Sequence, residues 1–140
     1  MGIFARAIGE ALGARQSRKR AEKQSPEITE TINKLIANAE QGNVQAMTEL
    51  GVKYGQGIGV GRDYDAAVYW WKKAAELGSV DAYFNLGVMY FGNVSIYYKN
   101  AYESYYWFEL AGKNGRNDAW DILNTYFVRN EFTGAIEIID

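Results

Sequence analysis

The chain has no cysteine and no histidine among its 140 residues. These absences exclude disulfides, thiolate nucleophiles, catalytic triads built on histidine, and zinc sites with Cys or His ligands. They leave an all-carboxylate metal site open, and they do not fix the cellular compartment. Proline is also scarce, with Pro26 alone. Because strand-rich folds usually carry more turn prolines, this scarcity favours a helical chain.

Long hydrophobic runs are missing as well. No stretch approaches the roughly 20 apolar residues that a membrane-spanning helix needs. The apolar start of the chain is interrupted by Arg6 and Glu10, which disfavours a secretory signal. Arg6 also stands where a myristoylation motif prefers Ser or Thr. We therefore expect a cytoplasmic protein.

The net charge of −2 is unevenly distributed along the chain. Residues 1–24 hold six Arg and Lys against Glu10 and Glu22, so this segment carries +4 and the remainder carries −6. A basic arm therefore precedes an acidic body. Because nucleic-acid binding depends on neutralising phosphates, the acidic body predicts that no nucleic acid is a partner.

An internal repeat is the main signal in the sequence. Each copy has a turn glycine, then a small residue, a leucine and an aromatic residue at successive intervals of four. The copies are Gly42, Ala46, Leu50, Tyr54; Gly78, Ala82, Leu86, Tyr90; and Gly115, Ala119, Leu123, Phe127. Residues four apart lie on one face of a helix, so each copy predicts a helical stripe. The turn glycines recur every 36 or 37 residues, which is typical of one helix pair per repeat.

Each anchor of the repeat has a physical task. The glycines follow helical runs, where a helix favours a left-handed residue after its last turn. The alanines let two helices approach closely, and the leucines fill the space between them. Trp70 and Trp107, one turn before Ala74 and Ala111, are expected to supply large buried area.

The stretch from Ala46 to Gly78 resembles the Sel-one-like repeat, a branch of the tetratricopeptide superfamily. The family pattern is matched by Ala46, Leu50, Gly51, Tyr54, Gly57, Gly59, Val60, Asp63, Ala67, Trp70, Lys73, Ala74, Ala75 and Gly78. The next unit, to Gly115, departs in its loop, where FGNVSIYYKN replaces G-x-G-V. The resemblance implies an all-α fold, a short right-handed α-solenoid of antiparallel helix pairs. Known members are mostly adaptors and scaffolds, and some are small bacterial immunity proteins that bind a toxin.

The pattern predicts a basic amphipathic arm over 1–24, a helical repeat domain over 25–127 and a capping tail over 128–140. Pro26 after Ser25 predicts a helix start, with Glu27 in the first turn. Helices are expected at 26–41, 44–54, 64–77, 80–90, 101–114 and 118–127. The tail GAIEIID is either a cover folded back on the last helix or a short strand.

Catalysis has little support in the sequence. The glycine loop Gly55, Gly57, Gly59 and Gly61 lacks the G-K-[ST] ending of a phosphate loop and follows no strand, so we interpret it as a helix connection. The Trp and Tyr residues of 69–71 and 105–108 are better explained by packing than by stacking on bases or sugars. No carboxylate pair combines spacing with apolar surroundings. We predict no catalytic residue, no cofactor and no metal site.

A binding surface is expected on the first helix of each pair, opposite the core face of Ala46, Leu50 and Tyr54. The predicted partner-binding residues are Thr48, Glu49 and Val52; Phe84, Asn85 and Val88; and Asp121, Ile122 and Thr125. In tetratricopeptide-like solenoids this face lines the concave groove, so the resemblance implies the role. The apolar centre and the acidic Glu49 and Asp121 suit a basic partner with apolar anchors. The open alternative is that these side chains meet the tail or the arm of the same molecule.

The arm has several possible roles. Its apolar residues fall at helical spacing before RQSRKR: Ile3, Phe4, Ala7, Ile8, Ala11 and Leu12. Such a segment could lie on an anionic membrane, dock in a partner's groove, reach the groove of a neighbouring copy, or stay solvated. Gly2, Gly9 and Gly13 weaken an isolated helix.

We conclude from the sequence that the protein is a non-catalytic module that binds a partner protein, of the immunity or adaptor type. The partner would be a toxin, effector or signalling protein. The alternative is a peripheral membrane scaffold attached through the arm.

Overall fold

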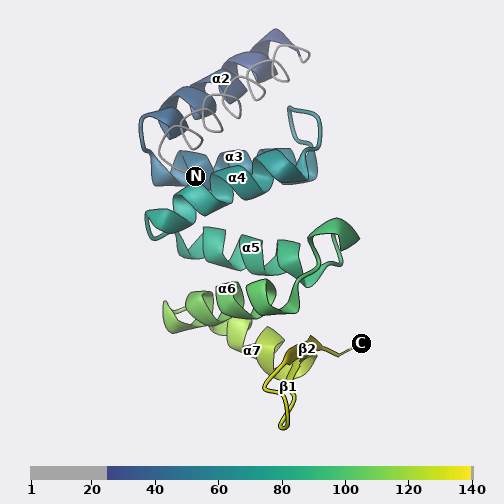
Figure 1. The fold of residues 1–140 in the computed structure, drawn as a ribbon. Coiled ribbons are helices and arrows are strands. Elements are labelled where there is room, and N and C mark those ends of the chain that lie inside the picture. The colour runs from purple at the N-terminus through teal and green to yellow at the C-terminus, as the bar shows by residue number, and fades with distance from the viewer. Residues whose placement is uncertain (1–24, 140) are drawn as a thin grey trace, which may run out of the picture. The chain divides into compact units, whose positions relative to one another are not determined.

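The computed structural model describes residues 25–139 and is built almost entirely of helices (Figure 1). This part of the chain consists of two compact units, the first ending at Leu77 and the second beginning at Gly78. The sequence-based division into arm, repeat domain and tail stays a prediction, and the arm lies outside the described residues.

The first unit contains α2 (Pro26–Glu40), α3 (Val44–Gln56) and α4 (Tyr64–Glu76). Side chains set two of the helix starts, because Asn43 Oδ1 accepts from the amide of Ala46 at 2.9 Å and Asp63 Oδ1 accepts from that of Ala66 at 3.2 Å. At α2, Pro26 occupies the first turn and the Ser25 side chain makes no capping hydrogen bond. α3 packs against both α2 and α4.

The core of the first unit lies where α3 meets α4. Leu50, Tyr54, Trp70 and Ala74 are almost completely buried. The Trp71 indole lies against Gly51, where a Cβ would collide with it, and its Nε1 donates to the Thr48 carbonyl at 3.2 Å. A glycine on α3 therefore admits a tryptophan of α4.

The second unit contains α5 (Val80–Phe91), a 3-10 turn η1 (Ile96–Tyr98), α6 (Ala101–Lys113) and α7 (Asn117–Tyr126). Two short strands follow, β1 (Phe127–Arg129) and β2 (Ile136–Ile138). The hydroxyl of Ser79 and the amide oxygen of Asn100 cap α5 and α6. The helices of the second unit pack in the same way as those of the first, since α5 lies against α6 and α6 against α7.

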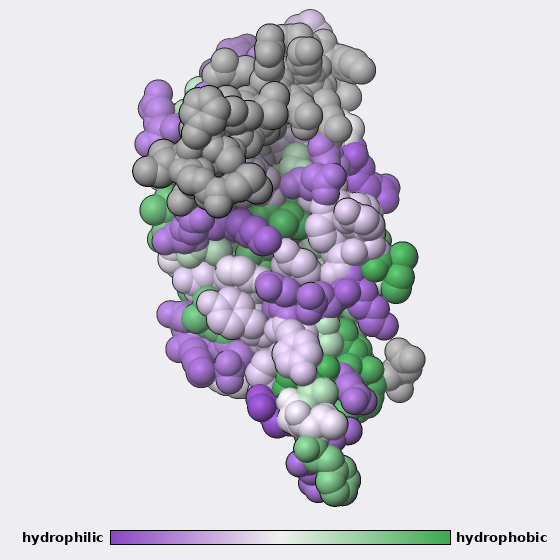
Figure 2. All heavy atoms as spheres, in the orientation of Figure 1, coloured by the Kyte–Doolittle hydropathy of each residue, from purple (hydrophilic) through white to green (hydrophobic). Residues whose placement is uncertain are grey.

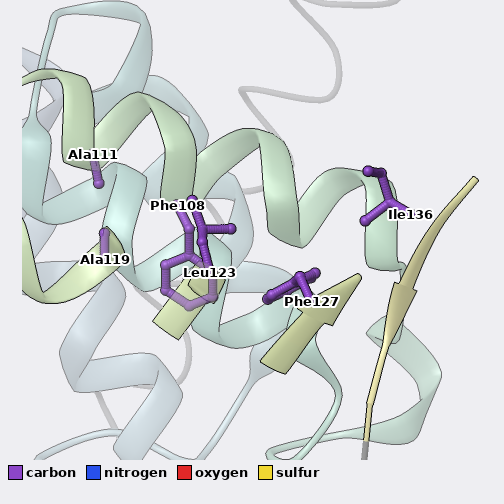
Figure 3. Packing of buried hydrophobic residues seen from close by; sticks show 6 residues of the cluster. All are labelled: Phe108, Ala111, Ala119, Leu123, Phe127 and Ile136. Carbon is purple, nitrogen blue, oxygen red and sulfur yellow. The ribbon is translucent and has the colours of Figure 1, made fainter. Parts of the chain in front are cut away.

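One hydrophobic cluster holds the second unit together (Figure 3). Its buried members are Phe108, Ala111, Ala119, Leu123, Phe127 and Ile136. The Phe108 ring lies against Gly87 of α5, as Trp71 lies against Gly51 in the first unit. The buried Ser104 donates from Oγ to the Gly87 carbonyl at 2.8 Å. The pairs α3/α4 and α5/α6 therefore share one contact, in which a glycine of the first helix faces an aromatic ring of the second.

The tail forms the second strand of an antiparallel hairpin, in which Phe127 faces Ile138 and Arg129 faces Ile136. Of the two alternatives for GAIEIID, the strand is therefore the one observed. The prediction that the last helix extends to Phe127 is wrong, because α7 ends at Tyr126 and Phe127 is extended. Pairing with β2 ends the helix, and β2 also packs against α6.

Trp107 is only half-buried, so the prediction that it is a core residue is wrong. The period aligns Trp107 with Trp70, but the core position of α6 is taken by its neighbour Phe108. Trp107 instead stacks on Tyr83 with ring centres 6.0 Å apart, and its Nε1 donates to Glu103 at 3.0 Å. Trp107 and Phe108 are adjacent, so their side chains point about 100° apart around α6, and only Phe108 points into the core.

Candidate functional site

Six of the nine predicted partner-binding residues lie in the second unit. Phe84, Asn85 and Val88 project from α5, and Asp121, Ile122 and Thr125 from α7. Asp121 and Thr125 are exposed, and the other four are half-buried. Half-burial is consistent with a helix face that packs at its base and reaches solvent at its edge.

An open cleft of about 350 Å³ brings two of these residues together, because Val88 and Ile122 line it from α5 and α7. Phe91, Asn93, Phe108 and Tyr126 complete its walls. Five of the six lining residues are apolar or aromatic, and Asn93 supplies polar atoms at the edge. Clefts of this size and composition suit an apolar side chain of a ligand.

Aromatic ring contacts connect the residues in and beside the cleft. The Phe91 and Tyr126 rings lie edge to face with centres 5.6 Å apart, one from each wall. Phe84 does not line the cleft but packs edge to face on Phe108, with ring centres 5.4 Å apart. Such contacts pack α5 against α6 and α7 around the cleft.

Charges at the start of α5 and α7 are bridged by Arg116. Its Nη1 lies 2.8 Å from Asp81 Oδ1, and its Nε lies 3.2 Å from Asp118 Oδ1. The guanidinium also covers the Phe84 ring at 3.9 Å. From residue 78 onward the sequence holds eight Asp and Glu against four Lys and Arg, so the unit that carries the cleft is acidic.

Within residues 25–139, the predicted residues of the first unit, Thr48, Glu49 and Val52, do not line the cleft described above. Glu49 is exposed, Val52 is half-buried, and the Thr48 hydroxyl donates to the Val44 carbonyl at 3.0 Å within α3. A separate pocket of about 320 Å³ lies elsewhere in this unit, lined by Glu27, Ile28, Thr31, Ile32, Lys53, Ile58 and Gly59. A partner-binding role for Thr48, Glu49 and Val52 stays a prediction.

Several residues of the second-unit site were missed in the sequence, among them Phe91, Tyr126 and Arg116. Phe91 and Tyr126 follow Val88 and Ile122 at intervals of three and four, so extending the helical stripe by one turn would have included them. Arg116 carries no such signal, because it contributes through contacts with α5, and those are not local in sequence.

Large hydrophobic side chains are also exposed around this unit, where Figure 2 shows green residues breaking a mostly hydrophilic surface. Tyr126 is 45% exposed at the cleft, and Ile96 and Tyr97 are 77% and 84% exposed on η1. Exposed aromatic residues of this kind are enriched at protein interfaces.

Residues 25–139 contain neither a metal-ligand cluster nor a helix that could cross a membrane. No group of three Asp or Glu side chains in this part of the chain is arranged to hold a metal ion. None of the helices described is long and apolar enough to cross a membrane.

Comparison with known proteins identifies the repeats. The sequence model of the Sel1 repeat matches residues 44–79 and 80–115, more than half of the chain. None of the curated proteins compared matches it.

Two solved structures are similar. One is a protective antigen of uropathogenic Escherichia coli strains with an SLR fold, at 42% identity and a TM-score of 0.61, over 66% of this chain and 20% of that one. The chain thus spans only a fifth of that antigen. The other is a Sel1 repeat protein from Oxalobacter formigenes, at 34% identity and a TM-score of 0.56, over 66% of this chain and 69% of that one. These matches confirm the resemblance stated from the sequence and the all-α helical-repeat fold class.

Proposed function

The chain belongs to the Sel1 repeat family, and from this premise we propose that it holds a partner protein in the cleft between α5 and α7. Sel1 repeat proteins are generally protein–protein interaction modules and are typically non-catalytic. The observation that carries the proposal is the meeting of Val88 and Ile122 in one open apolar cleft. Both residues lie on the helix face for which the sequence predicts binding.

The chemistry of the cleft indicates what it would bind. Its apolar walls suit one or two apolar side chains, such as those that an amphipathic helix presents along one face. The exposed Asp121 and the excess of acidic residues in this unit favour a cationic flank on the ligand. The partner segment is therefore basic with apolar anchors.

The finer proposal is an immunity-type or adaptor protein, which neutralises or scaffolds its partner by holding it. Both roles require a surface that holds the partner in a fixed position. The cleft between α5 and α7 supports them, because ring contacts brace its walls. Co-expression with the product of the neighbouring gene tests the immunity role. Restored growth in the presence of a toxic neighbour is expected, and unrelieved toxicity contradicts this role.

Attachment to a membrane through residues 1–24 is the second candidate. Its support is the +4 charge of the arm and the helical spacing of its apolar residues. Flotation of the full chain with vesicles containing anionic phosphatidylglycerol tests it, with Phe4→Ser/Ile8→Ser/Leu12→Ser as the matched variant. Flotation that depends on the arm supports this candidate, and absence of flotation removes it.

Affinity capture tests the main proposal. Immobilised full chain is compared with Val88→Asp and Ile122→Asp, and with Val128→Asp as control, since Val128 is 41% exposed on β1 and lines no cleft described above. A protein retained by the wild type and by the control, and lost with both cleft variants, supports the proposal. Equal retention by all four chains contradicts it. Circular dichroism of each variant verifies its fold.

A further inference from the structure

The cleft between α5 and α7 continues into a second pocket at the C-terminal end of α7, which we call the terminal pocket. It has a volume of about 280 Å³, and its lining includes Phe91, Asn93, Lys99, Tyr126 and Ile139. Phe91, Asn93 and Tyr126 line the cleft as well, so the two spaces adjoin and form one groove. A segment held in the cleft therefore reaches the terminal pocket by passing the edge-to-face pair of Phe91 and Tyr126.

Lys99 is the cationic residue of the terminal pocket, and the backbone around it is held in place. The amide of Lys99 donates to the Ile96 carbonyl at 3.1 Å, and the amide of Asn100 donates to the Tyr90 carbonyl at 2.9 Å. The aliphatic stem of Lys99 lies over Gly92, where a Cβ would come within 2.7 Å of Lys99 Cβ and Cγ. Gly92 ends α5 with a φ of 92°, a conformation that favours glycine. The end of α5 therefore positions the lysine at the pocket.

The charge of Lys99 has no counter-ion within residues 25–139, where no carboxylate forms an ion pair with it. The sequence holds four Lys and Arg from residue 78 onward. Of the other three, Lys113 and Arg116 pair with carboxylates, and Arg129 lines neither the cleft nor the terminal pocket. Lys99 is exposed, so its ammonium group is available to a carboxylate of a ligand.

The two ends of the groove carry opposite charges. Asp121 is exposed on α7 beside the cleft residue Ile122, five residues before Tyr126, and Lys99 lies beyond Tyr126 in the terminal pocket. Opposite charges at the two ends of an apolar groove select the direction in which a ligand lies, because a reversed ligand would meet like charges at both ends. A ligand with cationic groups alone would be repelled at Lys99.

We propose that the partner segment carries an acidic side chain, Asp or Glu, which pairs with Lys99 while the apolar anchors of the segment occupy the cleft. Its basic residues then lie toward Asp121, so the segment binds in one direction only. This inference rests on the proposed function, because Lys99 contacts the segment only if the cleft holds it.

Peptide selection on the full chain supplies the probes. A displayed library of random short peptides is selected on the wild type and counter-selected on Val88→Asp, which retains only peptides that depend on the cleft. We expect Asp or Glu on one side of the apolar positions and Lys or Arg on the other, always in the same orientation. Retained peptides without a preferred position for an acidic residue overturn the inference. A selection that yields no peptide dependent on Val88 contradicts the proposed function itself, and the inference with it.

A charge swap tests the contact with Lys99 directly. The tightest selected peptide is acetylated and amidated, so that no terminal carboxylate remains, and is compared with a variant whose acidic residue is replaced by lysine. The acidic peptide should bind Lys99→Glu about five-fold more weakly than the wild type, whereas the lysine peptide should bind Lys99→Glu more tightly. Arg129→Glu is the matched control, since it makes the same change in net charge at an exposed position outside the groove, and both affinities should stay unchanged.

Lys99→Gln is the second variant, because it removes the charge and keeps part of the stem over Gly92, and it should weaken the acidic peptide by about two-fold. Equal weakening by Lys99→Glu and Arg129→Glu overturns the inference, since it would report only the net charge of the chain. Unchanged binding to both Lys99 variants overturns it too, and leaves the proposed function standing if the same peptide still requires Val88.

Discussion

The guanidinium of Arg116 lies 3.9 Å from the centre of the Phe84 ring. Arg116 precedes α7 and Phe84 lies on α5, so this contact joins the two helices that form the walls of the cleft. The ion pair of Arg116 with Asp81 of α5 spans the same junction, and Asp118 of α7 pairs with the same guanidinium. The cleft therefore opens between helices that are fastened at their N-terminal ends.

Substitution of Arg116 tests this fastening. Arg116→Lys keeps the charge but loses the planar group that stacks on Phe84 and forks between two carboxylates, so we expect a loss of about 0.5–1 kcal/mol in the free energy of unfolding. Urea denaturation measures it, with Arg129→Lys on the exposed surface of β1 as control. Equal stabilities of the two variants would show that stacking on Phe84 contributes nothing.

Gly87 is expected to tolerate no side chain. A Cβ there would lie 2.7 Å from Cδ1 of Phe108, so Gly87→Ala must displace the ring at the centre of the second unit. We expect destabilisation of about 1–3 kcal/mol. Gly61→Ala is the matched control, because nothing lies within 4 Å of a Cβ at Gly61. A thermal midpoint for Gly87→Ala as high as that of the control contradicts the packing described here.

Ile136 tests the hairpin as a part of the core. It is 7% exposed and packs in the cluster around Phe108, so Ile136→Ala is expected to cost about 2–3 kcal/mol of unfolding free energy. Phe132→Ala, in the same hairpin but 96% exposed, should change stability by less than about 0.5 kcal/mol. If both changes are small in chemical denaturation, the strand does not support the second unit.

The helices could be predicted from the sequence because their signals are local. Gly42, Gly78 and Gly115 follow their helices with φ of 94°, 88° and 98°, which confirms the predicted left-handed positions. Each helix start falls within one residue of the expected one. The spacing of four within each helix and the period of about 36 residues between repeats predict where the helices begin.

Features that depend on contacts distant in sequence could not be predicted in the same way. Phe127 continues the helical stripe, but pairing with Ile138 draws it into a strand. Trp107 and Phe108 are both large and apolar, and the contact of Phe108 with Gly87 of α5 is not visible in the local sequence. The helical stripe singles out Val88 and Ile122, which line one cleft, whereas Arg116 depends on partners up to 35 residues away.

The central claim, that the cleft holds the partner, is tested most directly by calorimetric titration of the purified captured protein into the full chain. Ile122→Asp places a charge in the apolar wall, and we expect it to weaken binding by at least about 2 kcal/mol, or roughly 30-fold in Kd. Val128→Asp should leave Kd unchanged. A folded Ile122→Asp variant that binds as tightly as the wild type would contradict the account.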